Sequence, residues 1–433
     1  MDGMAKTKLL VIGAGASGLT AIKCCLDEGL EPVCFERSSY VGGLWHYTDE
    51  VEEGQACVMK STVANTSKEM MCYSDFPIPS EFAMYMRNTK VDCYLNMYAD
   101  NLKLKEYIQL NRETYDAVLV CSCHHSDKNI PDFPGLDKCM GSIIHTRDYK
   151  DFHEYEDRRV LVIRIGNLGV DVATELCKVS SKLRMAVILV ICVDHEKYSL
   201  QPNFPPFSAA QTFSDDLANR VATGSVIVKA NVSRFTENGV VFEDGTGVDA
   251  IDNVVMATRY SFGFPFLDRS IIEVKENRIN LFKYMFPPDD DHHTLAIIGC
   301  VKPVGAILPI SEMQCRQNEP TWSRYDVGGH PGQTGVHSSA LQCVSDTYNN
   351  KKLCLTDPRL ALDVFFGPTT PYQYLLHGPG AWKSASECIR TQWERTYKPL
   401  KTRPCNLKQA DGSGAMKCLV VLIVALLAYF FIF

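Results

Sequence analysis

The sequence predicts an α/β fold with two Rossmann-like domains and an apolar helix at the C-terminus. Three observations carry this prediction. A short apolar run at 9–12 leads into the spacing G-x-G-x-x-G at 13–18. A second apolar run, at 159–163, leads into a related turn at 164–169. The last 16 residues, 418–433, contain no charged side chain.

The first glycine-rich turn has the features of a dinucleotide site. Gly13 permits a tight turn, Gly15 lets the backbone approach a pyrophosphate, and Gly18 lets the helix pack closely on the strand. Glu36 closes a second apolar run, where an acid accepts hydrogen bonds from a ribose hydroxyl. The phosphates are expected at the helix N-terminus. The expected residues of the turn are Gly13, Ala14, Gly15, Ala16, Ser17 and Gly18.

Length and composition restrict the class of protein. With 433 residues, of which 46% are hydrophobic, the chain is long enough for two or three domains. A net charge of −7 argues against a nucleic-acid partner. The 18 cysteines include no C-x-x-C pair, which indicates free thiols in a reducing compartment. No metal site is expected, and the histidine pairs at 124–125 and 292–293 are interpreted as solvated.

The C-terminal segment 418–433 differs from the rest of the chain. As a helix, its 16 residues would be roughly 24 Å long at 1.5 Å per residue. A full crossing prefers ~20 residues, which as a helix are about 30 Å long. A buried terminal helix would normally have a polar face, and this segment has none. The sequence therefore predicts an anchor that dips into or barely crosses a bilayer.

The order of the patterns along the chain predicts an insertion of one domain into the other. Strand and helix patterns alternate up to about the second turn, and further apolar strands follow at 187–193, 253–258 and 294–298. The predicted parts are 1–156 as the start of the first domain, 157–260 as the inserted second domain, 261–402 as the return to the first domain with irregular 317–350, 403–417 as a linker, and 418–433 as the anchor.

Sequence blocks outside the two turns carry a family resemblance. They include ERSSYVGGLW at 36–45, STVANTSKEMMCYSDFP at 61–77 and TLAIIGCVKPVGAILPISEMQ at 294–314. The block 130–150 contains most of the motif F-x-G-x-x-x-H-x-x-x-Y. Together these blocks resemble the mammalian microsomal flavin-containing monooxygenases. The motif residues are Gly141, His145 and Tyr149, with Cys139 in place of the aromatic residue.

The resemblance implies the fold of class B flavoprotein monooxygenases, with FAD at the first turn and NADPH at the second. It implies that NADPH reduces the flavin, that O2 adds to the flavin, and that a small amine or sulfide takes one oxygen atom. Asn65 corresponds to an asparagine that contacts flavin and nicotinamide, so it is the expected catalytic residue. Ala64 stands where the family usually has Ser or Thr. The implied FAD residues beyond the turn are Glu36, Gly43, Leu44, Trp45, Asn65 and Thr66, and the implied NADP residues are Ala64, Asn65, Gly166, Asn167 and Gly169.

The resemblance also implies a location. An apolar C-terminal anchor is a trait of this family, so the chain is expected at the endoplasmic reticulum membrane, attached through its C-terminal tail to membrane lipid.

The second turn departs from the family pattern. Arg164 stands where the family has glycine, as do Arg259 and Cys123 at two other turns. After the strand predicted at 187–193, an acidic stretch, 194–196, replaces an arginine-bearing loop that would hold the NADP 2′-phosphate. Internal segments of the family are missing. Three interpretations remain open: a monooxygenase, a catalytically impaired FAD-binding relative, and a leaky NADPH oxidase that releases H2O2.

Overall fold

The structure of this chain is a computed structural model. It describes residues 7–50, 54–108, 115–122, 127–164, 166–180, 182–186 (backbone only), 214, 216–258, 260–275, 277–288, 294–301, 306–316, 353, 356–376 and 381–401.

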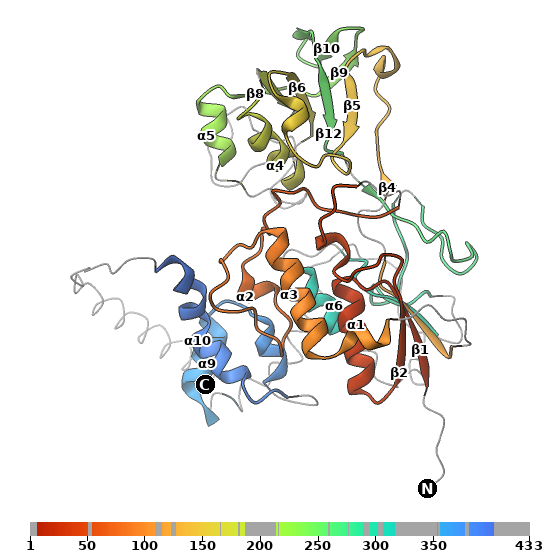
Figure 1. Ribbon diagram of the computed structural model, residues 1–433, viewed down its shortest axis with the longest axis vertical. Coiled ribbons are helices and arrows are strands. Elements are labelled where there is room, and N and C mark those ends of the chain that lie inside the picture. The colour runs from red at the N-terminus through yellow and green to blue at the C-terminus, as the bar shows by residue number, and fades with distance from the viewer. Residues whose placement is uncertain are drawn as a thin grey trace, which may run out of the picture.

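The first domain is built on a four-stranded parallel sheet (Figure 1). Its strands, in spatial order, are β14 (Leu295–Ile297), β3 (Ala117–Val120), β1 (Lys8–Ile12) and β2 (Glu31–Phe35). The chain leaves β1 toward β2 on one side and returns to β3 on the other. In open α/β sheets, ligands bind at the carboxyl ends of the strands at such a reversal.

Helices α1 (Ala16–Asp27) and α6 (Ile307–Arg316) pack against each other beside this sheet, and α3 (Asn88–Asn101) completes the layer (Figure 1). The apolar face of α1 is fully buried at Leu19 and Ile22. Residues 295–301 and 306–316 therefore return, far along the sequence, to the same core as residues 8–27. This return fits the expected insertion of the second domain.

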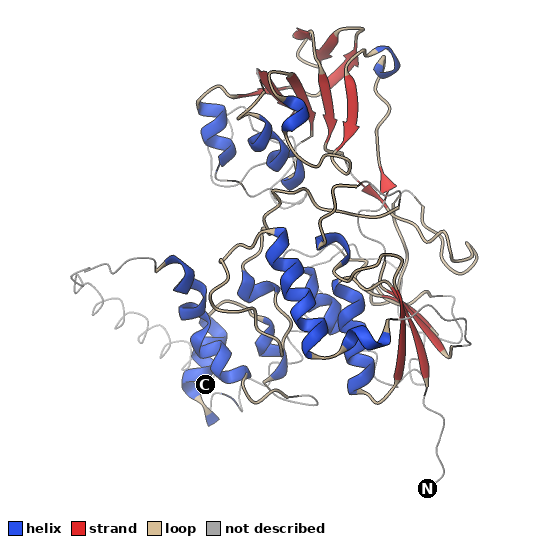
Figure 2. Cartoon of the chain, in the orientation of Figure 1, coloured by secondary structure: helices blue, strands red, loops and turns tan. Residues whose placement is uncertain are grey.

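The second domain contains a five-stranded sheet in which every pairing is parallel. Figure 2 shows it as a separate body with its own helices. It has two hydrophobic clusters of its own, one on each side of the sheet. The strands in spatial order are β5 (Ser142–His145), β12 (Asn253–Met256), β6 (Arg159–Ile163), β7 (Lys182–Ala186) and β8 (Val226–Lys229), with helices α4 (Asn167–Leu176) and α5 (Asp216–Ala222).

Smaller elements complete the structure. An antiparallel sheet joins β9 (Val232–Phe235), β10 (Gly239–Phe242) and β11 (Gly247–Asp249), and the ribbon between the domains pairs β4 (Asp127–Lys128) with β13 (Tyr260–Ser261). The remaining helices are α2 (Lys68–Met71), α9 (Pro358–Phe366) and α10 (Ala385–Tyr397), with short 3-10 turns η1 (Gly43–Trp45), η2 (Leu104–Tyr107), η3 (Leu136–Lys138), η4 (His153–Tyr155), η5 (Pro371–Leu375) and η6 (Lys398–Leu400).

The two Rossmann-like domains of the predicted fold are present, with β1 and β6 at the expected places. The strand expected at 187–193 and the segments 317–350, 403–417 and 418–433 lie outside the described residues. Within the described ranges, no helix has the length and apolar character needed to cross a membrane. Strand β5 pairs in the sheet of the second domain although it precedes residue 157, where that domain was predicted to begin. The domain boundaries as a whole stay a prediction.

Candidate dinucleotide sites

The first glycine turn connects β1 to α1 at the carboxyl end of the sheet. Gly13 has a φ of +100°, and its N–H donates to the Phe35 carbonyl at 2.8 Å. A Cβ on Gly18 would overlap the carbonyl oxygen of Gly13, so only glycine lets α1 start this close to the strand. A Cβ on Gly15 would have the Gly43 Cα as its nearest atom, at 3.6 Å. The fold therefore leaves room for a Cβ at Gly15, and its expected role toward a pyrophosphate stays a prediction.

Glu36 lies directly against this turn. Its carboxylate accepts the Ala14 N–H at 2.6 Å and the Ser38 N–H at 2.8 Å. The Ser38 hydroxyl donates to the same oxygen as the Ser38 N–H, at 2.8 Å. These bonds hold the acid at the end of β2, one strand away from the glycines. This is the placement that the expected ribose contact requires.

A second glycine segment closes over the first. The Gly42 N–H donates to the Ala14 carbonyl at 3.1 Å, and a Cβ on Gly43 would lie 3.0 Å from the Gly15 Cα. Gly43 begins η1, and its φ is +55°. The two backbones thus come so close that a Cβ on Gly43 would press against Gly15. This cradle is the observation that fits an extended dinucleotide, and it includes the expected residues Gly43, Leu44 and Trp45.

The fourth strand also contributes to this site, although this contribution was not predicted from the sequence. Gly299, two residues after the end of β14, has a φ of +78°, and a Cβ there would clash with the Ser17 hydroxyl. Ser17 Oγ lies 2.8 Å from Ser311 Oγ on α6. The signal was available in the sequence, because the apolar strand at 294–298 ends in a glycine as β1 does.

Asn65 lies on the segment 61–77, which reaches the first turn of α1. Its side chain is exposed, and the Thr66 hydroxyl is 3.5 Å from its Oδ1. Ala64 is buried, and its N–H donates to the Met86 carbonyl at 2.8 Å. The Tyr73 hydroxyl donates to the Ala16 carbonyl at 2.7 Å. Among the contacts described, this tyrosine, rather than Asn65 itself, joins the segment to the glycine turn.

The second turn has the geometry of the first, with an arginine at the position of the leading glycine. Arg164 has a φ of +82°, the left-handed region that Gly13 also occupies. A Cβ on Gly169 would overlap the Arg164 carbonyl oxygen and lie 3.0 Å from the Ala257 Cβ. Gly166 caps α4, and Asn167 is its first residue. The expected residues Gly166, Asn167 and Gly169 are therefore together, around a strained residue. Arg259, Cys123 and the acidic stretch 194–196 lie outside the described residues.

The motif residues of 130–150 hold the second domain together. His145 is buried, accepts the Arg147 N–H on Nδ1 at 3.1 Å, and has Nε2 3.2 Å from the Thr258 carbonyl. Since Nδ1 accepts, this network assigns the proton to Nε2. The Tyr149 hydroxyl donates to Glu175 on α4 at 2.9 Å.

One carboxyl group on α4 has a shifted pKa. Burial, with a smaller contribution from Glu175 four residues on, raises the pKa of Asp171 to about 6. Asp171 lies four residues after Asn167, the first residue of α4, so this carboxyl group is close to the glycine-containing turn at 164–169.

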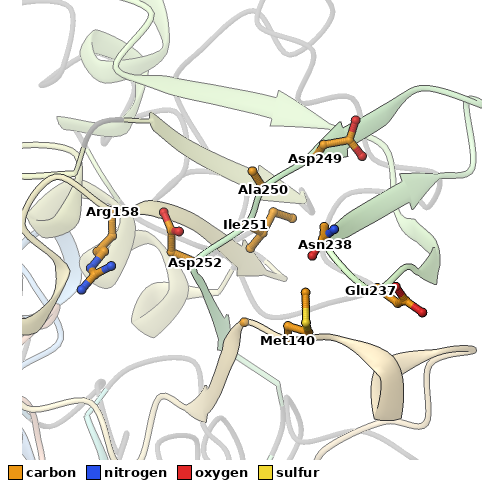
Figure 3. Close-up of a pocket in the computed structure, with 9 residues that line it drawn as sticks. Met140, Arg158, Glu237, Asn238, Asp249, Ala250, Ile251 and Asp252 are labelled. Carbon is orange, nitrogen blue, oxygen red and sulfur yellow. The ribbon is translucent and has the colours of Figure 1, made fainter.

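A pocket of about 530 Å³ lies at the opposite edge of the second domain (Figure 3). Its lining includes Gly141, Arg158 and Asp252, which directly precede β5, β6 and β12. These are the amino ends of parallel strands, whereas nucleotides bind at the carboxyl ends. We therefore do not assign the pocket to either dinucleotide.

Metal ligation finds no support in the described part of the chain. No group of three or more His, Cys, Asp or Glu residues there could hold an ion, and the cysteines described are free thiols. The histidine pairs at 124–125 and 292–293 lie outside it.

Sequence comparisons show strong similarity to known proteins. A family model described as flavin-binding monooxygenase-like matches residues 6–114, 110–190, 188–321 and 338–433. The chain is 39% identical over 535 aligned positions to flavin-containing monooxygenase 5 of Mus musculus, covering 99% of this chain and 100% of that protein. It is 36% identical over 533 positions to flavin-containing monooxygenase 3 of Oryctolagus cuniculus, covering 98% and 99%. Because the aligned positions outnumber the 433 residues here, the relatives carry internal segments that this chain lacks.

Solved structures share the fold. The S-allyl-L-cysteine S-oxygenase of Allium sativum matches with a TM-score of 0.62 at 20% identity, over 93% of this chain and 94% of that chain. A flavin-containing monooxygenase of Stenotrophomonas maltophilia matches with a TM-score of 0.56 at 17% identity, over 72% and 98%. At such identities the likeness shows the two-domain fold alone.

Proposed function

Because this chain belongs to the flavin-binding monooxygenase-like family, we propose that it uses FAD, NADPH and O2 to oxygenate nitrogen or sulfur in small lipophilic nucleophiles. Family membership supports flavin-dependent monooxygenation. The use of NADPH and the substrate class go beyond it and form the proposal.

The cradle formed by Gly13, Gly15, Gly43 and Glu36 is the observation that carries the proposal. Bound flavin would supply the redox and oxygen chemistry. The α1 N-terminus would face the pyrophosphate with its free N–H groups. Glu36 would accept the ribose hydroxyls on Oε2, which accepts the Ala14 N–H and has a second lone pair. Asn65, exposed on its turn, would offer an amide donor and acceptor to flavin and nicotinamide.

We propose further that NADPH binds weakly at the second turn. Arg164 occupies the position of the leading glycine of the tight turn, two residues before Gly166, where the backbone would approach the pyrophosphate. In the sequence, Asp194 and Glu196 stand where the family has cations for the 2′-phosphate. A carboxylate would repel that phosphate, so selectivity for NADPH over NADH should be lost.

The second candidate function is a leaky NADPH oxidase or an impaired FAD-binding relative. The left-handed Arg164 favours it, because a loosely held nicotinamide would leave the flavin site open to water, and O2 would then be released as H2O2 instead of oxygenating the substrate. Product analysis separates the two functions. The purified chain receives NADPH with a tertiary amine or a thioether, and N-oxide or S-oxide is measured beside H2O2. Oxygenated product as a substantial share of the NADPH consumed supports the monooxygenase, whereas H2O2 alone supports the oxidase and overturns our first assignment.

We also propose that the chain lies at the endoplasmic reticulum membrane, attached through residues 418–433. Membrane attachment rests on the uncharged apolar composition of that segment, and the endoplasmic reticulum location rests on the family resemblance.

A further inference from the structure

Two buried charges follow Asn65 almost immediately. Lys68 and Glu69, the first residues of α2, are 0% and 2% exposed. A charge removed from water requires a partner with good geometry, so the partners of these two side chains fix where α2 lies. Because α2 begins three residues after Asn65, those partners also determine the position of the Asn65 turn.

Glu69 takes its partners from the C-terminal end of the described chain. The Tyr372 hydroxyl in η5 donates to Oε2 at 2.8 Å. The Arg395 guanidinium on α10 places Nε 3.2 Å from Oε1 and 3.3 Å from Oε2. Arg395 also donates to the Ile78 carbonyl at 2.7 Å. Residues 303 and 326 positions away in sequence therefore hold one buried carboxylate.

Lys68 is held from the other side. Its ammonium donates to the carbonyls of Ser80 and Phe82, both at 2.7 Å. Its N–H donates to the Met84 carbonyl at 2.9 Å, and the Ala64 N–H donates to Met86 at 2.8 Å. The turn 65–67 is thus clamped at both ends. The exposed Asn65 amide accepts a hydrogen bond from the hydroxyl of Thr66 in the same turn, so its orientation follows the backbone of the turn.

We propose that Arg395 and Tyr372 are positioning residues for Asn65, acting through Glu69. The proposal rests on the proposed function, in which Asn65 contacts the flavin. Without the ion pair, α2 would shift to rehydrate the Glu69 carboxylate, and the Asn65 turn would shift with it.

A double-mutant cycle tests this inference. The dissociation constant of FAD is measured by flavin fluorescence for the full chain, for Asn65→Ala, for Arg395→Gln and for the combination. Tyr372→Phe is a milder second probe, because it removes one hydroxyl and keeps the packing. Arg390→Gln is the matched control, since Arg390 lies on the same helix and pairs with the surface carboxylate of Asp357 instead.

If Arg395 acts through Asn65, its effect should disappear when Asn65 is absent, because coupled residues are not additive. We expect Arg395→Gln to raise the dissociation constant about tenfold in the parent chain and less than about twofold in the Asn65→Ala background. Tyr372→Phe should follow the same pattern at about threefold, and Arg390→Gln should change nothing in either background.

Equal effects of Arg395→Gln in both backgrounds, or no effect in either, would overturn the inference, since the arginine would then act on the fold in general or not at all. A Tyr372→Phe effect that is additive would do the same even if Arg395→Gln fails to fold. An unmutated chain that does not bind FAD would instead refute the proposed function, and with it the premise of the inference.

Discussion

Within the first turn, one glycine is required by the fold, and another is expected to be required by the bound dinucleotide. In the first turn, a Cβ at Gly18 would overlap the Gly13 carbonyl, whereas one at Gly15 would meet only ordinary contacts. The two positions are three residues apart in the same motif. Substitutions at them should therefore fail for different reasons.

We expect Gly15→Val to abolish flavin retention while the chain stays folded, because its branched side chain would occupy the pyrophosphate path. Gly18→Ala should instead lower the thermal stability of the apoprotein, since α1 must move away from β1. The flavin-to-protein ratio after purification and circular dichroism melting of apoprotein measure the two effects. A Gly15→Val chain that keeps stoichiometric flavin would show that the first turn is not the site.

Arg164 is a residue with a side chain at a turn position that Gly13 occupies in the first domain. It adopts a φ of +82°, a conformation that costs a residue with a Cβ about 1–2 kcal/mol. The position was recognisable from the sequence, because it stands first in a G-x-G-x-x-G-like turn. The structure adds that the backbone keeps the glycine conformation rather than relaxing around the arginine.

Arg164→Gly should raise the free energy of unfolding by ~0.5–1 kcal/mol, the strain relieved less the backbone entropy that glycine loses. It should also strengthen nicotinamide binding. Urea unfolding measures the first effect, with Gly13→Ala as the control in the opposite direction, because Gly13 has a φ of +100°. A less stable Arg164→Gly chain would mean that contacts of the arginine outweigh the strain.

Asp171 predicts a pH dependence. Burial raises its folded-state pKa to about 6, above the ordinary value of 3.8. Between those two pH values the folded chain binds more protons than the unfolded chain, so this group lowers stability as pH rises. The loss is complete above pH ~6 and absent below pH ~4.

Asp171→Asn should therefore stabilise the chain at pH 7.5, by on the order of 1–3 kcal/mol, and leave it nearly unchanged at pH 4. Thermal melts across pH 4 to 7.5 compare the variant with Asp137→Asn, whose side chain is exposed. A constant difference at every pH would contradict the shifted pKa of Asp171.

At the scale of elements, strands β1 and β6 and the glycine turns after them were predictable, because apolar runs followed by glycine-rich spacing are local signals. The contact between Gly43 and Gly15 was harder to predict from the sequence, since it depends on two turns meeting in space. The family resemblance alone suggested it. Glu69 and its partners were not found from sequence, because their separation of 326 residues leaves no local pattern.

The segment 418–433 should act as a separate attachment element. Burying about ten large apolar side chains at ~1.5–3 kcal/mol each exceeds what a single lipid chain provides. Deleting 418–433 should move the expressed chain from the membrane pellet to the soluble fraction without changing its flavin content. If the truncated chain still sediments with membranes after a salt wash, another surface attaches it.

At the scale of the whole molecule, the two glycine turns differ in how well they keep the residues of a dinucleotide site. The first keeps its glycines, its acid and a second glycine segment that closes over it. The second keeps Gly166, Asn167 and Gly169 but folds around an arginine. We therefore expect a flavoprotein of the monooxygenase family in which FAD is held well and NADPH is held poorly.

Anaerobic reduction of the flavin by NADPH and by NADH tests this central claim most directly. The full chain, purified in detergent, is titrated with each nicotinamide while the flavin absorbance is followed. We expect a flavin spectrum at one FAD per chain. We also expect an NADPH affinity at least about tenfold weaker than that of an intact family member, since one lost charge-assisted bond is worth ~1.5–3 kcal/mol. NADPH should have little advantage over NADH. Arg164→Gly should recover part of the affinity, and Asp194→Arg should recover the preference for NADPH. Tight, strongly NADPH-selective bleaching of the unmutated chain would contradict this claim, as would the absence of bound flavin.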